Sequence, residues 1–435
     1  MNKDFLIGAA TASHQVEGNN IHSDFWVMEN LKHSDFAEPS GLAVDHYNRY
    51  EEDIQLLADA GCNAYRFSIE WARIEPEEGR YDYREIGHYR KVLHCCRENG
   101  ITPIVTLHHF SSPAWLIRKG GWTNECTVDS FAKYARYVAM QLKDELEYVC
   151  TINEANMGFQ LHKVMDDMKK ASQREGSVQV GVQLDMKKIL LSMLEQGVAF
   201  RCNPLKIGAF LRPRSSEQEQ IVMRSHQAAK QALKSAAPQV KVGLTLSLFD
   251  YQPVDGGEAV AAQLWQEDFG QYLPYIHDDD FLGVQNYSRK IVDAKGVREP
   301  AKDAPLTQMG YEDYPQSIGH VLRKVAKEFP GELIVTENGI ATDNDARRCD
   351  FIREAFAGVM QARAEGVPVK GYLYWSLLDN FEWQAGFGKT FGLIAVDRKT
   401  QTRYPKESLK VLGSLNAKEG ENKDEYNQLQ NELDL

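Results

Sequence analysis

Residues 148–154 read Tyr-Val-Cys-Thr-Ile-Asn-Glu, an apolar and β-branched run that ends in an amide and a carboxylate. A short run of this kind is typical of a buried β-strand. Similar runs recur along the chain, and together they predict eight strands, at residues 5–12, 64–71, 101–109, 148–154, 241–249, 280–288, 332–338 and 369–377.

Stretches with helical periodicity separate most of these runs, at residues 48–60, 84–99, 128–144, 217–235, 315–329 and 346–365. Alternating strands and helices make a parallel sheet, and eight such units without a spare edge favour one closed (β/α)8 TIM barrel of the α/β class. A doubly wound open sheet is the alternative. Its glycine-rich phosphate-binding fingerprint is absent after the first run.

No long Pro-, Gly- or Ser-rich linker divides the 435 residues, so we expect a single barrel domain at 1–415 with long βα loops. Residues 416–435 carry two lysines against six acidic residues and form a predicted acidic C-terminal tail, to which we assign no chemistry.

The connection at residues 155–240 is much longer than one crossover helix requires. Met157, Leu161, Met165 and Met168 fall at helical spacing within it. We expect them to form the core-facing stripe of an accessory helix and to bind neither a metal nor a cofactor.

Composition excludes several classes of protein. A net charge of −12 argues against nucleic acid as a partner, and no apolar run is long enough to cross a membrane. The seven cysteines are scattered without a C-x-x-C pair, which favours reduced thiols and a cytoplasmic location. The apolar stretch 5–10 is too short for a signal peptide, and Asp4 interrupts the positive region that should precede it.

In such a barrel the reactive groups lie at the carboxyl ends of the strands. The fourth run ends in TINE (151–154) and the seventh in TENG (336–339), so Glu154 and Glu337 face the same mouth. A single Glu at a strand end is more often a surface or capping residue. Two carboxylates across one mouth suit glycosidic bond cleavage, which needs one group protonated and the other ionised.

Hydrogen-bonding and aromatic residues crowd the other strand ends, as a sugar site requires: Gln15, His108, His109, Trp375, Glu382 and Trp383. Arg66 and Tyr287 could keep one carboxylate ionised, although an ordinary ion pair explains Arg66 equally well. Successive strand residues point to opposite sides, so His108 and His109 cannot easily bind one metal ion. One of them should face the mouth and the other should be packed.

These residues resemble glycoside hydrolase family 1, the retaining β-glycosidases, over residues 5–415. The pieces that carry the resemblance are FLIGAATASHQVEG (5–18), YRFSIEWARIEP (65–76), TLHHF (106–110), TINEAN (151–156), GVQNYSR (283–289), IVTENG (334–339), YWSLLDNFEW (374–383) and FGLIAVD (391–397).

The resemblance implies that Glu154 is the general acid and then the base, and that Glu337 is the nucleophile. Arg66 and Tyr287 would orient Glu337, and Trp375 would stack beneath the sugar. Its hydroxyls would be bound by Gln15, His109, Asn153, Glu382 and Trp383. Neither a metal nor another cofactor is needed, and retention predicts carboxyl groups about 5 to 5.5 Å apart.

Three positions depart from the family pattern: Ala155 stands where proline usually follows the acid, Gln285 where Asn is frequent, and Phe110 where Trp is frequent. The connection after Asn156 also lacks the usual P-P-G loop. We therefore expect the leaving-group side of the pocket to be reshaped.

The expected function is that of an exo-acting β-glycosidase that removes terminal glucosyl, galactosyl or fucosyl units from short oligosaccharides or aryl glycosides. We expect its partner to be a small carbohydrate. The sequence is compatible with either a monomer or a homo-oligomer. A 6-phospho-β-glycosidase is one alternative, but Glu382 would repel a phosphate dianion. A non-catalytic sugar-binding or regulatory barrel is another, although a binder has no need of two opposed carboxylates.

Overall fold

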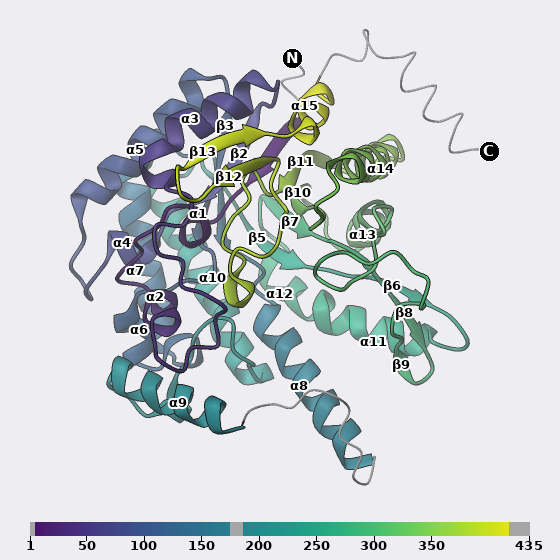
Figure 1. Ribbon diagram of the computed structural model, residues 1–435, viewed down its shortest axis with the longest axis horizontal. Coiled ribbons are helices and arrows are strands. Elements are labelled where there is room, and N and C mark those ends of the chain that lie inside the picture. The colour runs from purple at the N-terminus through teal and green to yellow at the C-terminus, as the bar shows by residue number, and fades with distance from the viewer. Residues whose placement is uncertain (1–4, 175–185, 417–435) are drawn as a thin grey trace.

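Eight parallel strands close into a barrel in the computed structural model, which describes residues 5–174 and 186–416 (Figure 1). In sequence order they are β1 (Leu6–Ala10), β2 (Ala64–Ser68), β3 (Thr102–His108), β4 (Tyr148–Ile152), β5 (Lys241–Ser247), β7 (Phe281–Gln285), β10 (Glu332–Asn338) and β11 (Val369–Trp375). All eight predicted strands are confirmed. The open-sheet alternative is wrong, because β1 pairs in parallel with both β2 and β11.

The barrel closes through a very tight contact between β1 and β2. Gly8 is the register partner of Ala64, and a Cβ atom on Gly8 would lie 1.7 Å from the Ala64 carbonyl oxygen. Only glycine therefore lets the two backbones come this close.

Side chains fill the barrel interior, so ligands can bind only above it, at the carboxyl ends of the strands. The buried interior cluster consists of Leu6, Ala64, Ile104, Tyr148, Cys150, Phe281, Ile334 and Leu373. A much larger apolar cluster lies between the strands and the surrounding helices.

Helices surround the barrel, and the six predicted ones are confirmed within a few residues: α3 (His46–Asp59), α5 (Tyr83–Glu98), α7 (Cys126–Leu142), α10 (Ser216–Ala236), α13 (Ser317–Val325) and α14 (Asp345–Ala364). Further helices are α11 (Glu258–Asp268), α12 (Leu273–Ile276) and α15 (Glu407–Ser414). Apolar faces explain their positions, and α10 begins with a reciprocal capping box between Ser215 and Gln218.

Short elements at the barrel ends were not predicted. The helical ones are α1 (Ser13–Val16), α2 (Asp24–Glu29), α4 (Trp71–Ile74), α6 (Ala114–Arg118), η1 (Gly121–Thr123), η2 (Pro204–Lys206), η3 (Gly270–Tyr272) and η4 (Trp383–Ala385). The strands β6 (Asp250–Pro253), β8 (Arg289–Asp293) and β9 (Gly296–Val297) form one small sheet, and β12 (Ile394–Asp397) pairs with β13 (Thr402–Pro405).

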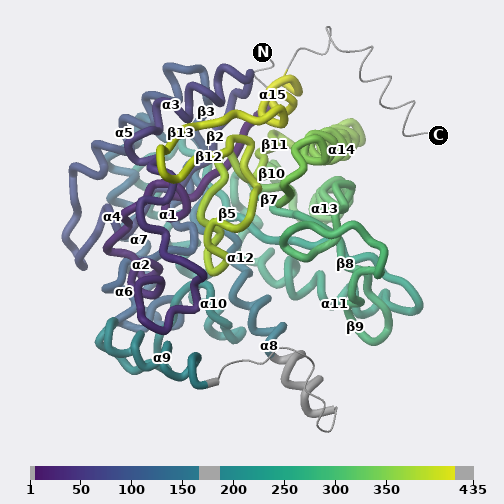
Figure 2. Tube along the Cα trace, in the orientation of Figure 1, coloured from purple at the N-terminus to yellow at the C-terminus, as the bar shows by residue number. Residues whose placement is uncertain are grey.

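The long connection after β4 forms α8 (Met157–Arg174) and α9 (Met186–Phe200), and Figure 2 shows α9 beside α2 and α6. The accessory helix is confirmed, but its core-facing stripe is wrong at Met165, which is 45% exposed. Met157 and Leu161 are only half-buried, because α8 projects away from the barrel (Figure 1). The side chain of Met168 lies outside the described residues.

The first residue of the predicted tail packs against the described chain. Asn416 is buried, and its amide donates a hydrogen bond to the Gly61 carbonyl at 2.9 Å. Residues 417–435 lie outside the described residues, so the division at 415/416 stays a prediction. Among the described residues, no helix combines the length and apolar character needed to cross a membrane.

The β1–β2 contact yields a stability prediction. Replacing Gly8 with Ala forces these strands apart and should lower the free energy of unfolding by about 1–3 kcal/mol, measured by denaturant unfolding. Gly87 in α5 is the matched control, because a Cβ there meets nothing within 4 Å. Gly87→Ala should raise stability by about 0.5–1 kcal/mol. Equal effects of the two substitutions would contradict the closure described here.

Candidate active site

Glu337, at the carboxyl end of β10, is buried among hydrogen-bond donors. Its Oε1 accepts from Nη1 of Arg66 at 2.7 Å and from Nε2 of Gln285 at 3.0 Å, and its Oε2 accepts from the Tyr287 hydroxyl at 2.6 Å. Burial raises the pKa of Glu337, and these donors, Arg66 foremost, oppose the rise. The donors therefore offset part of the cost of burying the ionised carboxylate.

Arg66, fully buried in β2, also binds the end of β4. Its Nη2 donates to Oδ1 of Asn153 at 2.5 Å, and Nε2 of Gln285 donates to the same oxygen at 2.7 Å. The amide orientation of Asn153 is thus set, and its Nδ2 lies 3.2 Å from Nε2 of His109. Burial lowers the pKa of His109 well below its usual range, so the ring is neutral. If Nε2 accepts from Asn153, the ring proton lies on Nδ1.

Glu154 occupies the turn after β4 and is 7% exposed. Its φ of 41° lies in the left-handed region, which costs a residue other than glycine about 1–3 kcal/mol. Its backbone N–H donates to the Thr245 hydroxyl at 2.9 Å. Burial and the negative charge of Glu337 raise the pKa of Glu154 to about 8, while the Ser247 side chain opposes part of this rise. Glu154 therefore keeps its proton at neutral pH.

The two carboxyl groups are thus close enough to interact, and their surroundings differ. Arg66 forms an ion pair with Glu337, whereas Glu154 forms none in the described part of the chain. The ion pair with Arg66 favours ionisation at Glu337, and the charge of Glu337 raises the pKa of Glu154. The pair can supply a proton and a nucleophile to one ligand.

Gln15 and Glu382 form a second polar group beside this pair. Gln15 is fully buried in α1, and its Nε2 donates to the Phe381 carbonyl at 2.8 Å and to Oε2 of Glu382 at 3.3 Å. Burial of the carboxyl group and the charge of Glu337 raise the pKa of Glu382 to about 8.

Several buried polar atoms around these groups lack a hydrogen-bond partner among the described residues. They are Oε1 of Gln15, Nδ1 of His109 and Oε1 of Gln285. Buried polar atoms are normally paired, so these unpaired atoms favour a ligand that both donates and accepts hydrogen bonds near this cluster.

Aromatic rings supply the apolar surface of the site. The rings of Trp375 and His109 lie 5.5 Å apart and 21° from parallel. Trp383 stacks on His14 at 5.9 Å and packs against Phe25 at 4.7 Å. Flat rings beside hydrogen-bonding groups suit the C–H faces and hydroxyl edges of a sugar.

The structure brings all ten predicted site residues into this one cluster: Gln15, Arg66, His109, Asn153, Glu154, Tyr287, Glu337, Trp375, Glu382 and Trp383. His108 instead packs on Trp122 and hydrogen-bonds to Ser112 at 3.0 Å, as expected for one of the two histidines. No group of three or more His, Cys, Asp or Glu residues within the described ranges could hold a metal ion.

Two contributing residues were not assigned to the site from the sequence. Gln285 was noted only as a departure, although it lies two residues before Tyr287 and so shares its face of the chain. Thr245 binds the backbone of Glu154 from β5, but a threonine in a strand carries no functional signal of its own.

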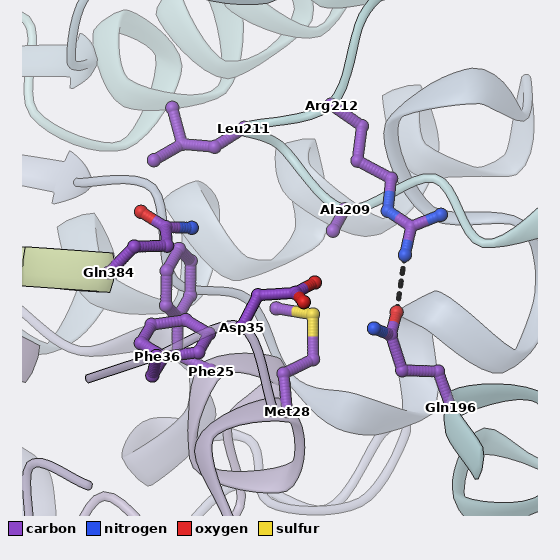
Figure 3. A pocket seen from close by; sticks show the side chains of 9 residues that line it. All are labelled: Phe25, Met28, Asp35, Phe36, Gln196, Ala209, Leu211, Arg212 and Gln384. Carbon is purple, nitrogen blue, oxygen red and sulfur yellow. Dashed lines mark hydrogen bonds between the residues drawn. The ribbon is translucent and has the colours of Figure 1, made fainter. Parts of the chain in front are cut away.

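A pocket of about 150 Å³ adjoins the cluster (Figure 3). Its wall includes Phe25, which packs on Trp383, and Gln384, the next residue along the chain. Gln196 and Arg212, from the long connection after β4, lie on the other side and hydrogen-bond to each other. The remaining lining residues are Met28, Asp35, Phe36, Ala209 and Leu211.

Comparisons with known proteins agree with this geometry. The family model described as glycosyl hydrolase family 1 matches residues 1–168 and 269–421. A β-glycosidase of known structure, BGL167, is 41% identical with a TM-score of 0.87, covering 96% of this chain and 97% of that one. Beta-glucosidase A of Thermotoga maritima is 33% identical, over 93% of this chain and 95% of its own. A 6-phospho-beta-galactosidase of Clostridium acetobutylicum is 27% identical, over 93% and 94%.

The protonation of Glu154 can be measured directly. We expect a protonated carboxyl band in the infrared spectrum that is lost as the pH rises through about 8, because burial and Glu337 raise the pKa of Glu154. The band should be weaker in Glu154→Gln at pH 7. In Glu337→Gln the neighbouring charge is gone, so the Glu154 band should titrate at lower pH. Identical titrations in wild type and Glu337→Gln would contradict the coupling.

Proposed function

The chain belongs to glycosyl hydrolase family 1 and is an O-glycosyl hydrolase, and from that premise we propose a retaining, exo-acting β-glycosidase. It removes terminal β-D-glucosyl, β-D-galactosyl or β-D-fucosyl units from short oligosaccharides or aryl glycosides by double displacement. The observation that carries the proposal is the difference in surroundings between the two carboxyl groups. Glu337 forms an ion pair with Arg66, whereas the pKa of the neighbouring Glu154 is raised to about 8.

In the first displacement, a carboxylate oxygen of Glu337 attacks the anomeric carbon while Glu154 donates its proton to the departing glycosidic oxygen. The bond to the leaving group breaks, and a glycosyl ester forms on Glu337. Arg66 and Tyr287 keep Glu337 ionised and oriented before attack.

In the second displacement, the ionised Glu154 takes a proton from water as the water oxygen attacks the same carbon. The ester bond breaks and Glu337 returns as a carboxylate. Arg66 and Gln285 both bind Oδ1 of Asn153, so the Nδ2 group on the other side of the fixed amide is the donor for the sugar 2-hydroxyl. That hydrogen bond strengthens as positive charge develops on the ring.

The glycosyl unit is bound by polar side chains that can still form hydrogen bonds and by aromatic rings. Gln15, Glu382 and His109 offer hydrogen bonds to its hydroxyls, Trp383 adds its indole N–H, and Trp375 stacks beneath the ring. Gln15 and Glu382 can bond either orientation of the 4-hydroxyl, which is why several sugars are included.

The pocket in Figure 3 is proposed to receive the leaving group. It shares the Phe25–Trp383 contact with the sugar site, and about 150 Å³ is enough for a six-membered ring. Asp35 and Arg212 line this pocket with opposite charges. A neutral ring with hydroxyl groups therefore suits the pocket better than an anion. Residues 196–212 lie between the two parts of the chain that the family model matches.

The two alternatives receive less support. Some relatives are named 6-phospho-beta-galactosidase, but the Glu382 carboxyl group, whose pKa is about 8, would repel a phosphate at hydrogen-bonding distance once it is ionised. A non-catalytic sugar binder would not need a buried acid beside a buried carboxylate. A cytoplasmic location is also proposed, supported by the free thiol of each cysteine.

An assay with nitrophenyl β-glucoside tests the catalytic pair. Glu337→Gln should reduce turnover by at least about 10⁴-fold, because no nucleophile remains. Glu154→Gln should largely spare the first step for activated phenolates, which leave without a proton, and lose it for alkyl glucosides. Equal activity of the three proteins would remove both assignments.

Leaving-group specificity tests the pocket. Arg212→Met should lower kcat/KM about tenfold for a disaccharide, whose leaving sugar loses hydrogen bonds, and should leave nitrophenyl β-glucoside almost unchanged. Arg224→Met removes an exposed arginine of α10 and serves as control. A uniform change on both substrates would contradict the placement of the leaving group.

A further inference from the structure

The turn that carries Glu154 lacks the proline usual at this place in similar sequences, and Ala155 follows instead. A proline ring would fix its own φ angle, whereas alanine leaves the backbone free. Glu154 nevertheless adopts a left-handed φ of 41°, which persists only when surrounding contacts enforce it. One such contact is the Ala155 N–H, which donates to the Thr245 carbonyl at 3.1 Å and which proline could not provide.

A fully buried arginine holds the other side of this turn. Nη2 of Arg214 donates to the Ala155 carbonyl at 2.8 Å, and Nη1 donates to the Phe210 carbonyl. Its Nε donates to Glu219 at 2.8 Å, and the second oxygen of Glu219 accepts from the Tyr272 hydroxyl at 2.9 Å. Every nitrogen of the guanidinium group is thus engaged, so its position is set from several directions.

The start of α8 is shaped around this arginine. A Cβ atom at Gly158 would lie 2.3 Å from Cζ of Arg214, so only glycine leaves room for the guanidinium group. The backbone N–H of Arg214 also donates to the Gly158 carbonyl at 2.9 Å. Arg214 therefore binds the chain both one and four residues after Glu154.

We propose that Arg214 is a positioning residue for the general acid: by holding the Ala155 carbonyl, it aims the Glu154 carboxyl group at the glycosidic oxygen. The proposal rests on the proposed function of Glu154. Arg214 lies between the two parts of the chain that the family model matches.

A purely stabilising role explains the pair less well. Burying an arginine and a glutamate carries a large desolvation cost, and apolar residues of similar size are often at least as stabilising. What the charged pair adds is direction, since the planar guanidinium group binds three acceptors at fixed angles.

The consequence is specific to one step of the reaction. A displaced acid slows cleavage only when the leaving group needs a proton, and kcat/KM reports the steps up to its departure. Replacing Arg214 should thus lower kcat/KM strongly for an alkyl β-glucoside. It should lower kcat/KM only slightly for a dinitrophenyl β-glucoside, whose phenolate leaves unprotonated.

The test is the double variant Arg214→Met with Glu219→Gln, which avoids leaving a buried carboxylate unpaired. We expect kcat/KM for methyl β-glucoside to fall about 10²-fold, as for a misplaced catalytic group, with little change for the dinitrophenyl substrate. Arg214→Lys, with Glu219 intact, keeps the positive charge but loses the planar set of N–H donors. Its kcat/KM for methyl β-glucoside should lie between the values of the double variant and the wild type.

The matched control is Arg403→Met with Asp53→Asn. Arg403 is buried, donates to both oxygens of Asp53 at 2.7 and 2.8 Å, and binds the Val44 carbonyl at 2.8 Å. This double variant loses a similar ion pair. It should lower kcat/KM for the methyl and the dinitrophenyl β-glucoside equally, or leave both unchanged.

Five outcomes would count against these assignments. Equal losses on both substrates in the Arg214 variant, or no loss on either, would overturn the positioning role. The Arg403 variant showing the same substrate dependence would overturn it as well. A wild type that cleaves neither substrate would contradict the proposed function itself, and a wild type whose Glu154→Gln variant shows no substrate dependence would contradict the assignment of the acid.

Discussion

The site depends on one buried ion pair, between Arg66 and Glu337. Both side chains are almost completely removed from solvent, and removing one partner of such a pair typically costs about 3–5 kcal/mol. The closed barrel makes the pair tolerable, because β2 and β10 present the two groups at bonding distance and Gln285 and Tyr287 satisfy more of the carboxylate. The charge on Glu337 then raises the pKa of its neighbour Glu154.

From this pair the division of labour in the site follows by electrostatics. A guanidinium group favours ionised Glu337, and ionised Glu337 disfavours ionised Glu154. Because Arg66 also binds Asn153, the residue before Glu154, the same side chain links the charge of one carboxylate to the backbone position of the other. The turn itself is held by Thr245 of the barrel strand β5 and, from outside the barrel, by Arg214.

The barrel and the site were largely predictable because their signals are local. Each strand is an apolar run, and the carboxyl ends of parallel strands must meet at one rim, so Glu154 and Glu337 could be brought together from sequence alone. The individual roles came from resemblance to a family. The stripe of α8 was mispredicted at Met165, since helical spacing reveals a shared face and not whether a partner covers it.

Contacts between distant segments could not be predicted in the same way. Nothing in the sequence links Arg214 to Ala155, or the pocket residues Phe25 and Arg212, because loops after different strands place them together. Gln285 illustrates the intermediate case: its place on the strand was readable, but its simultaneous bonds to Glu337 and Asn153 depend on the geometry of three strands.

The central claim is that Glu337 attacks the anomeric carbon while Glu154 holds the proton. Dinitrophenyl 2-deoxy-2-fluoro-β-glucoside tests this claim most directly. The fluorine slows hydrolysis of the glycosyl ester, and the dinitrophenolate leaving group needs no general acid. Mass spectrometry of the digested protein should find the fluorosugar on the peptide that contains Glu337, in a one-to-one ratio. A sugar attached to Glu154 or to another residue, or inactivation without any covalent label, would contradict the account.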